Sequence, residues 1–273
     1  MAQLTVLGAS GYIGSHLVTK LLRQGHAVST PGRREPLTGT ALGTVIYCIG
    51  LTGDFRSHPY DTVEAHVHHL SHVLQCCRFD RLVYLSSTRL YLGAPGDASE
   101  EAALSVQPSR ADDLYNLSKA LGEALALHSG RPTCVVRLSN VYGDDWTSNN
   151  FLPSIIKTAL RDRVVTLHTD LQSSKDYVYI DDLIDVLIRI TVEGTERIYN
   201  IASGRNVSHR ELLGRLEQLC GCTVRTVADA PRITFPRIAI ARIQREFGFS
   251  PRCLLDELPR LVATYQLHRR EWN

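Results

Sequence analysis

Apolar residues follow two alternating patterns along this chain. The first is a short, almost unbroken apolar run, as at residues 4–7, which predicts a strand buried on both faces. Further runs of this kind predict strands at 27–30, 45–49, 82–85, 133–138 and 198–201. Between several of these runs, apolar residues recur every three or four positions, which predicts amphipathic helices. Strands that alternate with helices predict an α/β fold with a doubly wound parallel sheet.

One predicted helix follows the third strand, and its apolar face is formed by Val63, Val67, Leu70 and Leu74. The same helix carries a group of histidines: His66, His68, His69 and His72. Because His68 and His72 are one helical turn apart, they share a face and would be able to chelate a metal. We expect a polar helix face or a subunit interface instead, since nothing nearby in the sequence completes a ligand set.

Two stretches depart from the regular alternation. Residues 31–43 are too few and too rich in helix breakers for a helix and a strand, so we expect the second crossover of the sheet to be missing or vestigial. From about residue 204 the pattern becomes irregular, although Ser208 and Glu211 form a capping box that predicts a helix start. A final helix is expected near 254–268. We therefore expect a main domain and a smaller lobe, made respectively of 1–143 with 175–203 and of 144–174 with 204–273.

The composition is that of an ordinary globular protein. Its 273 residues include 30 basic and 28 acidic side chains, so no global field favours nucleic acid or an anionic membrane as a partner. No apolar run is long enough to span a bilayer and the first residues lack the features of a signal peptide, so we expect a cytoplasmic protein. The seven cysteines have neither zinc-site nor redox spacing and are expected to be reduced packing residues.

A glycine-rich turn follows the first predicted strand. Gly8 allows a sharp turn out of the strand, Gly11 allows backbone amides to approach a pyrophosphate, and Gly14 allows the next helix to pack on the sheet. The N-terminus of that helix adds a preference for negative charge. Because the turn lies between a strand and an amphipathic helix, we interpret it as a dinucleotide site rather than a structural turn. The expected cofactor contacts here are Gly8, Ser10, Gly11, Tyr12, Ile13 and Gly14.

The residues after the second strand bear on the choice of dinucleotide. An acidic residue there would bind the ribose hydroxyls of NAD(H), whereas an arginine would accept the 2′-phosphate of NADP(H). The strand end has no carboxylate, and two arginines, Arg33 and Arg34, follow it. We therefore expect NADP(H) to be favoured over NAD(H), with a solvated basic turn as the alternative interpretation.

Tyr115 and Lys119 are placed on the same face of a helix by their spacing. A neighbouring ammonium and a positive nicotinamide ring favour the phenolate, so Tyr115 would exchange a proton with a substrate while the cofactor exchanges hydride. The fourth strand ends in three hydroxyls, and ligands of doubly wound folds bind at such carboxyl ends. We expect Ser87 to hydrogen-bond the reacting oxygen, whereas a strand-end cap suits Ser86 and Thr88 better.

These motifs make the chain resemble the extended short-chain dehydrogenases/reductases, in the group often called the NAD-dependent epimerase/dehydratase family, which mostly acts on nucleotide sugars. The resemblance runs nearly end to end and is carried by GxxGxxG at 8–14, the strand at 82–87, YxxxK at 115–119, RLSNVYG at 137–143, KDYVYIDD at 175–182, YNIASG at 199–204 and FGFSP at 247–251. It implies a catalytic set of Ser87, Tyr115 and Lys119, in which Lys119 also holds the nicotinamide ribose. It implies a homodimer as well.

The resemblance also implies contacts with a substrate. Asn140 matches a position that commonly touches the phosphates of a sugar nucleotide, and Lys175 stands where the family often has a phosphate-binding arginine. In the C-terminal lobe, Arg232 and Arg237 are candidates for binding a nucleotide diphosphate, with surface charges as the alternative. The expected substrate-binding residues are therefore Ser87, Thr88, Asn140, Lys175, Arg232 and Arg237. No metal is expected.

Several positions depart from the family pattern. Thr88 and Arg89 replace the acidic pair that follows the catalytic threonine in sugar 4,6-dehydratases, so elimination of water is not expected. His66 stands where the family usually has an asparagine, and Asp144 replaces a proline at the entry to the substrate lobe.

Three functions fit these motifs. The first is a reductase that acts on a keto group of a nucleotide-linked sugar with NADPH, in which Tyr115 gives the proton and Ser87 polarises the oxygen. The second is an epimerase, which oxidises and re-reduces one carbon while it retains its cofactor. The third is a regulator that senses a dinucleotide, but such a protein would not need the complete set of Ser87, Tyr115 and Lys119.

Overall fold

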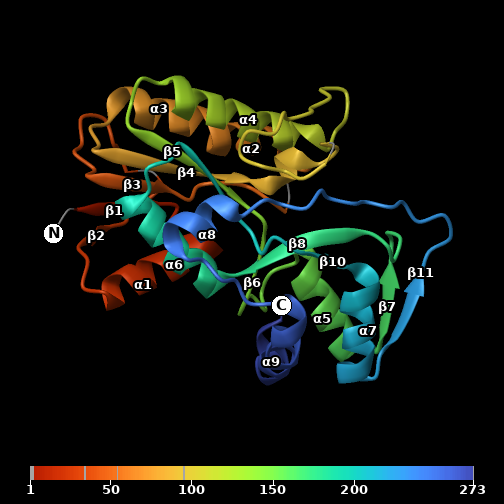
Figure 1. Ribbon diagram of the computed structural model, residues 1–273. Helices are drawn as coiled ribbons and strands as arrows, with labels where there is room; N and C mark the ends of the chain where they lie inside the picture. The colour runs from red at the N-terminus through yellow and green to blue at the C-terminus, as the bar shows by residue number, and fades with distance from the viewer. Residues whose placement is uncertain (1–2, 34, 54, 95, 273) are drawn as a thin grey trace.

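Parallel strands form the central sheet of the structure, a computed structural model that describes residues 3–33, 35–53, 55–94 and 96–272 (Figure 1). The strands are β1 (Leu4–Leu7), β2 (Val28–Ser29), β3 (Thr44–Tyr47), β4 (Arg81–Ser87), β5 (Thr133–Leu138) and β9 (Ile198–Ile201). Their order across the sheet is β2-β1-β3-β4-β5-β9, and all neighbours run parallel. The prediction of a doubly wound α/β fold is confirmed.

Helices cover both faces of this sheet (Figure 1). One face is covered by α1 (Tyr12–Arg23), α6 (Ile180–Glu193) and α8 (Ala241–Phe247); the other is covered by α2 (Pro59–Val63), the π-helical turn η1 (Glu64–His68), α3 (His69–Cys76) and α4 (Asp113–His128). Successive strand residues face opposite ways, so Val6 packs in one hydrophobic cluster and Leu7 in the other. This explains why the strand sequences are almost continuously apolar.

The connection between β2 and β3 is short. Among the described residues between them, 30–33 and 35–43, there is no helix and no strand, only a single bridge from Ala41 to Arg78. Leu37 and Leu42 of this segment are buried against the face covered by α3, which fixes its path. The chain passes directly from one side of β1 to the other, so the missing second crossover is confirmed.

The helix after β3 buries a different face from the one expected, because it contains the π-helical turn η1. Leu70 is buried and Leu74 is almost fully buried, as expected, but Val63 is 40% exposed. The inward positions of the first turns are Thr62 and His66, which are completely buried. A π-helical turn holds more residues than an α-helical turn, so it displaces the buried position by one residue. The turn thus carries a histidine, not a valine, toward the sheet.

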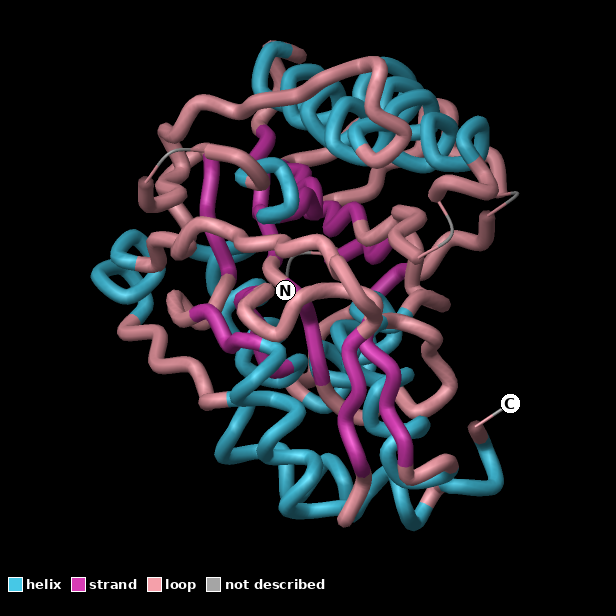
Figure 2. The backbone as a smooth tube through the Cα atoms, turned by 90° about the vertical axis from the view of Figure 1, so that its right-hand side faces the viewer, coloured by secondary structure: helices cyan, strands magenta, loops and turns pink. Residues whose placement is uncertain are grey.

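A smaller part of the structure extends from the carboxyl ends of the strands. It contains a sheet of β10 (Asn206–Ser208), β8 (Ser174–Tyr179) and β6 (Asn140–Tyr142), the parallel pair β7 (Val164–Leu167) and β11 (Thr223–Thr226), and the helices α5 (Phe151–Arg161), α7 (His209–Cys220) and α9 (Leu254–Leu267). In Figures 1 and 2 the strands β7 and β11 lie side by side at the far edge of this lobe. The 3₁₀ turns η2 (Thr88–Tyr91) and η3 (Arg269–Glu271) complete the elements.

The start of α7 is set by the predicted capping box. The Ser208 hydroxyl accepts a hydrogen bond from the Glu211 amide at 3.2 Å, and the Glu211 carboxylate accepts one from the Ser208 amide at 2.9 Å.

The domain boundaries stay a prediction. The helix α8, which the sequence placed in the C-terminal lobe, packs against β9 and α6 of the large sheet. None of the described helices is long and apolar enough to cross a membrane.

Candidate active site

A cavity of about 420 Å³ opens at the carboxyl ends of β1, β3, β4 and β5, between the large sheet and the lobe. Most of the predicted site residues line it: Gly11, Tyr12, Ile13, Gly14, Ser87, Thr88, Tyr115, Lys119, Asn140 and Lys175. Gly8 and Ser10 belong to the same glycine turn but do not line the cavity. The structure therefore brings together, from five separate segments, the residues that the sequence assigned to one site.

The glycine turn leaves the N-terminus of α1 open to a ligand. Gly8 has a φ of +86°, which favours glycine, and a Cβ atom at Gly14 would lie 2.2 Å from the Gly8 carbonyl oxygen. Gly11 caps α1 without a side-chain hydrogen bond, and no acidic residue occupies the first turn. A Cβ at Gly11 would only touch Gly8 at 3.4 Å, so protein packing alone does not require glycine there. The free amides and the open surface fit a dinucleotide pyrophosphate.

The Tyr115 phenol is buried in the cavity wall. Its ring lies 5.4 Å from the Phe55 ring and 5.3 Å from the His66 ring, measured between centroids. Burial raises the pKa of Tyr115, while a hydrogen bond with Ser87 and the positive charge of Arg89 oppose that rise. The net direction is upward, so the phenol holds its proton at neutral pH and is ready to donate it.

Lys119 lies one helical turn after Tyr115. Its Nζ donates a hydrogen bond to the Leu85 carbonyl at 2.8 Å and lies 4.9 Å from the centre of the Tyr84 ring. Burial lowers the pKa of Lys119 to about 7, although Glu123 in the next turn raises it. The ammonium is therefore poised near neutrality, where it is able to stabilise a neighbouring phenolate.

His66 is tied to this helix by an ordered chain of hydrogen bonds. Its Nε2 accepts from the Leu51 amide at 3.1 Å, so the proton lies on Nδ1, which donates to the Ser118 hydroxyl at 2.8 Å. Ser118 donates in turn to the Tyr115 carbonyl at 2.9 Å. Burial and the charge of Lys119 lower the pKa of His66 to about 2, which keeps the imidazole neutral. His66 thereby connects the loop after β3 to the helical turn that carries the phenol.

Two tyrosines hold the π-helical turn in place. Tyr47 donates its hydroxyl proton to the Ala65 carbonyl at 2.7 Å, and Tyr84 donates to the His66 carbonyl at 3.2 Å. A Cβ at Gly50 would lie 3.4 Å from both the His66 imidazole and the Lys119 ammonium, so the loop after β3 passes close over both groups. The other histidines of this helix lie elsewhere: His68 pairs with Glu64 at 2.6 Å on the surface.

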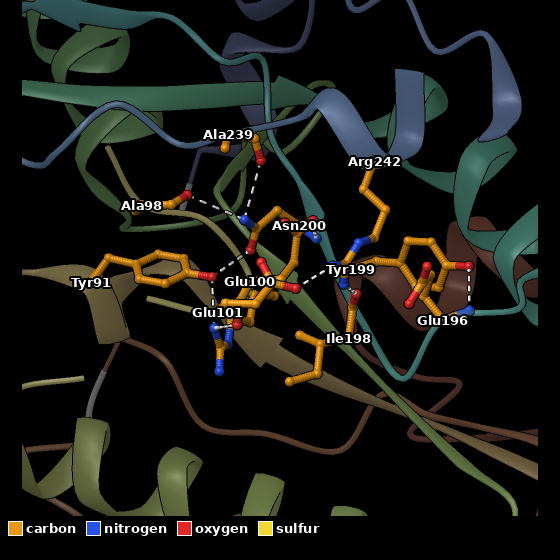
Figure 3. A network of polar contacts seen from close by, with 11 residues as sticks. Tyr91, Ala98, Glu100, Glu101, Glu196, Ile198, Tyr199, Asn200, Ala239 and Arg242 are labelled. Carbon is orange, nitrogen blue, oxygen red and sulfur yellow. Dashed lines mark hydrogen bonds and ion pairs between the residues drawn. The ribbon is translucent and has the colours of Figure 1, made fainter. Parts of the chain in front are cut away.

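The turn η2, which carries Thr88 and Arg89, is anchored at its far end by Tyr91. The Tyr91 hydroxyl donates to the Asn200 side chain at 2.8 Å and accepts from Arg137 at 2.6 Å. Figure 3 shows how the Asn200 amide also reaches the carbonyls of Ala98 and Ala239, at 3.4 and 3.1 Å. This buried network holds η2 in place at the end of β4, from which the cavity residues project.

On the lobe side, Lys175 and Asn140 lie where the resemblance expects substrate contacts. The Lys175 Nζ lies 4.8 Å from the centre of the Phe151 ring, and burial together with the charge of Arg89 lowers its pKa. The Asn140 amide donates to the Asp176 carbonyl at 2.8 Å. A partly buried ammonium beside an aromatic ring favours an anion as its partner.

The other predicted contacts do not reach the cavity lining. Arg237 donates from Nε to the Gly204 carbonyl at 3.0 Å, and Arg232 lies on the exposed surface; Phe235, between them, lines the cavity instead. Arg33 lies in the exposed loop after β2, and Arg34 lies outside the described residues. The geometry gives no support to a diphosphate contact from Arg232 or Arg237. The position of a loop residue in the sequence does not determine the direction of its side chain, so residue type alone was not enough to place these two arginines.

Several lining residues were not assigned from the sequence. Phe55 lines the cavity beside the Tyr115 ring, Tyr177 of β8 lines it on the lobe side, and Arg89 lines it from η2. Arg89 had a signal, since it follows the strand-end hydroxyls directly, but it was considered only for the acidic pair that it replaces. Phe55 lies in a loop whose path depends on the π-helical turn, so no pattern marked it.

The doubly wound sheet, the glycine turn and the Tyr115–Lys119 pair beside Ser87 define the class of the protein as a short-chain dehydrogenase/reductase of the extended type. Residues 4–202 match the model of the NAD dependent epimerase/dehydratase family, and the chain belongs to that family. The family resemblance proposed from the sequence is confirmed.

Known proteins of several activities are similar to this chain. A dTDP-4-dehydro-6-deoxy-D-allose reductase from a Streptomyces species is 26% identical, over 97% of this chain and 96% of its own length. A dTDP-glucose 4,6-dehydratase from Streptomyces griseus is 33% identical, over 61% of this chain and 54% of its own. The solved structure of MoeE5 in complex with UDP-glucose and NAD has a TM-score of 0.80 at 23% identity and covers 99% of this chain and 100% of its own, which shows the shared fold.

Proposed function

We propose that the protein reduces a keto group of a nucleotide-linked sugar with NADPH. The observation that carries this proposal is the buried phenol of Tyr115, which lines one cavity together with Ser87, Lys119 and the glycine turn. Burial raises the pKa of this phenol, so it keeps its proton at neutral pH. A phenol in this state is a proton donor, which is what the reduction of a carbonyl requires. The reductase relative, which matches almost the whole chain, supports the same reaction class.

The site residues divide the chemistry of such a reduction between them. A bound dinucleotide would supply hydride to the carbonyl carbon. Tyr115 gives its proton to the carbonyl oxygen, and the ammonium of Lys119 stabilises the phenolate that results. The Ser87 hydroxyl accepts a hydrogen bond from the Arg89 amide at 3.1 Å and keeps its own proton, which it would donate to the carbonyl oxygen of a bound substrate.

Unpaired hydroxyls support a polyhydroxylated substrate. Tyr12, Ser86 and Tyr177 line the cavity, and each has a buried hydroxyl without a hydrogen-bond partner within the described part of the chain. A buried hydroxyl that stays unpaired costs free energy, so a ligand that pairs with it is favoured. Lys175 and Asn140 add a charge and an amide suited to phosphates. A sugar joined to a nucleotide by phosphates offers both kinds of partner.

The preference for NADP(H) rests on Arg33 in the loop directly after β2. The acid of that loop, Glu35, accepts a hydrogen bond from the Gly32 amide at 3.0 Å and so is engaged within the turn itself. With this carboxylate engaged and Arg33 exposed in the same loop, a dinucleotide with a 2′-phosphate is favoured.

The proposal is tested with a panel of nucleotide-linked keto sugars, each supplied with NADPH and separately with NADH. We expect oxidation of NADPH by at least one member and a higher kcat/KM with NADPH than with NADH. A purified protein that carries tightly bound NAD and interconverts two sugars without added dinucleotide would overturn the reductase and identify the epimerase. Formation of a 4-keto-6-deoxy sugar from a hexose would contradict the exclusion of dehydration, which the lack of a carboxyl at Thr88 and Arg89 supports.

The pKa of Lys119 predicts how the reaction depends on pH. Because burial lowers this pKa to about 7, the ammonium loses its charge as the pH rises above neutrality. The phenolate left by proton donation then loses its stabilising neighbour, so the kcat/KM for NADPH, which reports the free enzyme, should be constant at mildly acidic pH and fall above about 7. Initial rates from pH 5.5 to 9 test this. A reductive kcat/KM that stays constant up to pH 9 would contradict the role given to Lys119.

A further inference from the structure

We propose that Arg89 binds a carboxylate on the sugar near its reacting carbon, so that the substrate is a nucleotide-linked sugar acid. This inference rests on the proposed function, because it takes the cavity to be the site of a nucleotide-linked sugar. It adds the chemical class of the sugar, which the motifs leave open.

Arg89 projects into the catalytic end of the cavity. It follows Thr88 in the turn η2, and its own backbone amide donates a hydrogen bond to the Ser87 hydroxyl. Its guanidinium carbon lies 5.6 Å from the centre of the Phe55 ring, which in turn packs on Tyr115. A group bound by Arg89 would therefore lie beside the atoms that exchange the proton.

The guanidinium has hydrogen-bonding capacity left over. Its Nε is buried and has no partner among the described residues. The nearest acid, Asp112, lies 3.6 Å from one terminal nitrogen, outside hydrogen-bond distance, and its carboxylate is shared with Arg56 at 2.6 Å. Asp112 is thus shared between two guanidiniums, which leaves Arg89 without a hydrogen-bonded acid among the described residues. A planar carboxylate matches the free edge of Arg89 in a two-bond geometry.

The charges of the cavity wall lead to the same conclusion. Among the residues that the structure describes, the charged side chains that line the cavity are Arg89, Lys119, Asp145 and Lys175. In the proposed complex Lys119 faces the nicotinamide ribose and Lys175 faces the phosphates of the substrate. If the sugar were neutral, the buried Nε of Arg89 would keep no hydrogen-bond partner among the described residues. A carboxylate on the sugar supplies the missing partner and pairs the buried Nε.

The test compares UDP-glucuronic acid with UDP-glucose as probes, by calorimetric titration of the full-length protein saturated with NADP⁺. We expect the wild-type protein to bind the acid at least about tenfold more tightly than the neutral sugar, because a hydrogen-bonded charge pair contributes roughly a tenfold to hundredfold factor. Arg89→Met should weaken binding of UDP-glucuronic acid by that factor and change binding of UDP-glucose less than twofold.

Arg56→Met is the matched control. Arg56 shares Asp112 and the Phe55 ring with Arg89 but does not line the cavity. Because Arg56→Met leaves Asp112 to pair with Arg89 alone, it should lower the ratio of the two affinities only in part, whereas Arg89→Met abolishes the preference and Arg89→Lys should recover part of it. Thermal unfolding of each variant checks that the fold is retained.

The proposal is overturned if the wild-type protein binds the acid no more tightly than the neutral sugar, or if Arg89→Met weakens both ligands equally. Failure of the reductase proposal looks different. In that case the acid still binds with an Arg89-dependent preference, but no keto sugar is reduced by NADPH. Conversely, rapid reduction of a neutral keto sugar with a KM that does not respond to Arg89→Met would overturn the inference about the acid and leave the reductase proposal intact.

Discussion

Tyr115→Phe is expected to lower the kcat for keto-group reduction by about a thousandfold, within the range known for loss of a general acid. Phenylalanine keeps the ring, which packs against Phe55 and His66, so the cavity wall is preserved. Only the proton donor and its contact with Ser87 are lost. The affinity for NADPH should change less than threefold, because the glycine turn and Lys119 are untouched.

Stopped-flow turnover and fluorescence titration with NADPH measure these two quantities. Tyr177→Phe is a matched control, since Tyr177 is another buried tyrosine that lines the cavity and whose hydroxyl has no partner in the described chain. It should cost less than tenfold in kcat. Equal activity of Tyr115→Phe and the wild-type enzyme would rule out Tyr115 as the proton donor.

The largest loss of stability is expected from Arg137→Met. Arg137 of β5 forms a two-bond ion pair with Glu123 of α4, at 2.9 and 2.7 Å, and both side chains are at least 95% buried. Removal of one partner leaves an uncompensated buried charge, which costs roughly 3–5 kcal/mol of unfolding free energy. The Tyr91 hydroxyl also loses a donor, which loosens the anchor of η2.

Urea denaturation measures this loss. The double variant Glu123→Met with Arg137→Met removes both charges and should regain most of the stability, because two apolar side chains pack where the pair was. Lys20→Met, which breaks the largely exposed pair with Asp185, should change the unfolding free energy by less than about 1 kcal/mol. A loss below 1 kcal/mol for Arg137→Met would show that the buried pair is not a principal source of stability.

Features set by local periodicity were predictable from the sequence. The strand 4–7, the glycine turn and the capping box at Ser208 depend on neighbouring residues, and the structure reproduces each of them. Tyr115 and Lys119 were found because a helical spacing fixes their relation. Their meeting with Ser87 was predictable as well, because carboxyl ends of parallel strands share one edge of the sheet.

Features set by tertiary contacts were not predictable. The π-helical turn depends on Tyr47 and Tyr84, whose hydroxyls come from two other strands, so a regular helical period misplaced Val63 and concealed the role of His66. Arg237 has the residue type of a phosphate ligand, but its side chain bonds to the Gly204 carbonyl. Residue type states what a side chain is able to bind, whereas its direction depends on the fold around it.

The short connection between β2 and β3 affects how long a dinucleotide stays bound. With no helix or strand in the described residues between them, we expect few side chains to surround the adenosine end of a bound dinucleotide. Differences in affinity among related complexes arise mostly in the dissociation rate, so a brief residence time is expected. That suits a reductase, which must release the oxidised dinucleotide after every turnover. The fraction of enzyme ready to react then follows the ratio of reduced to oxidised dinucleotide in its surroundings.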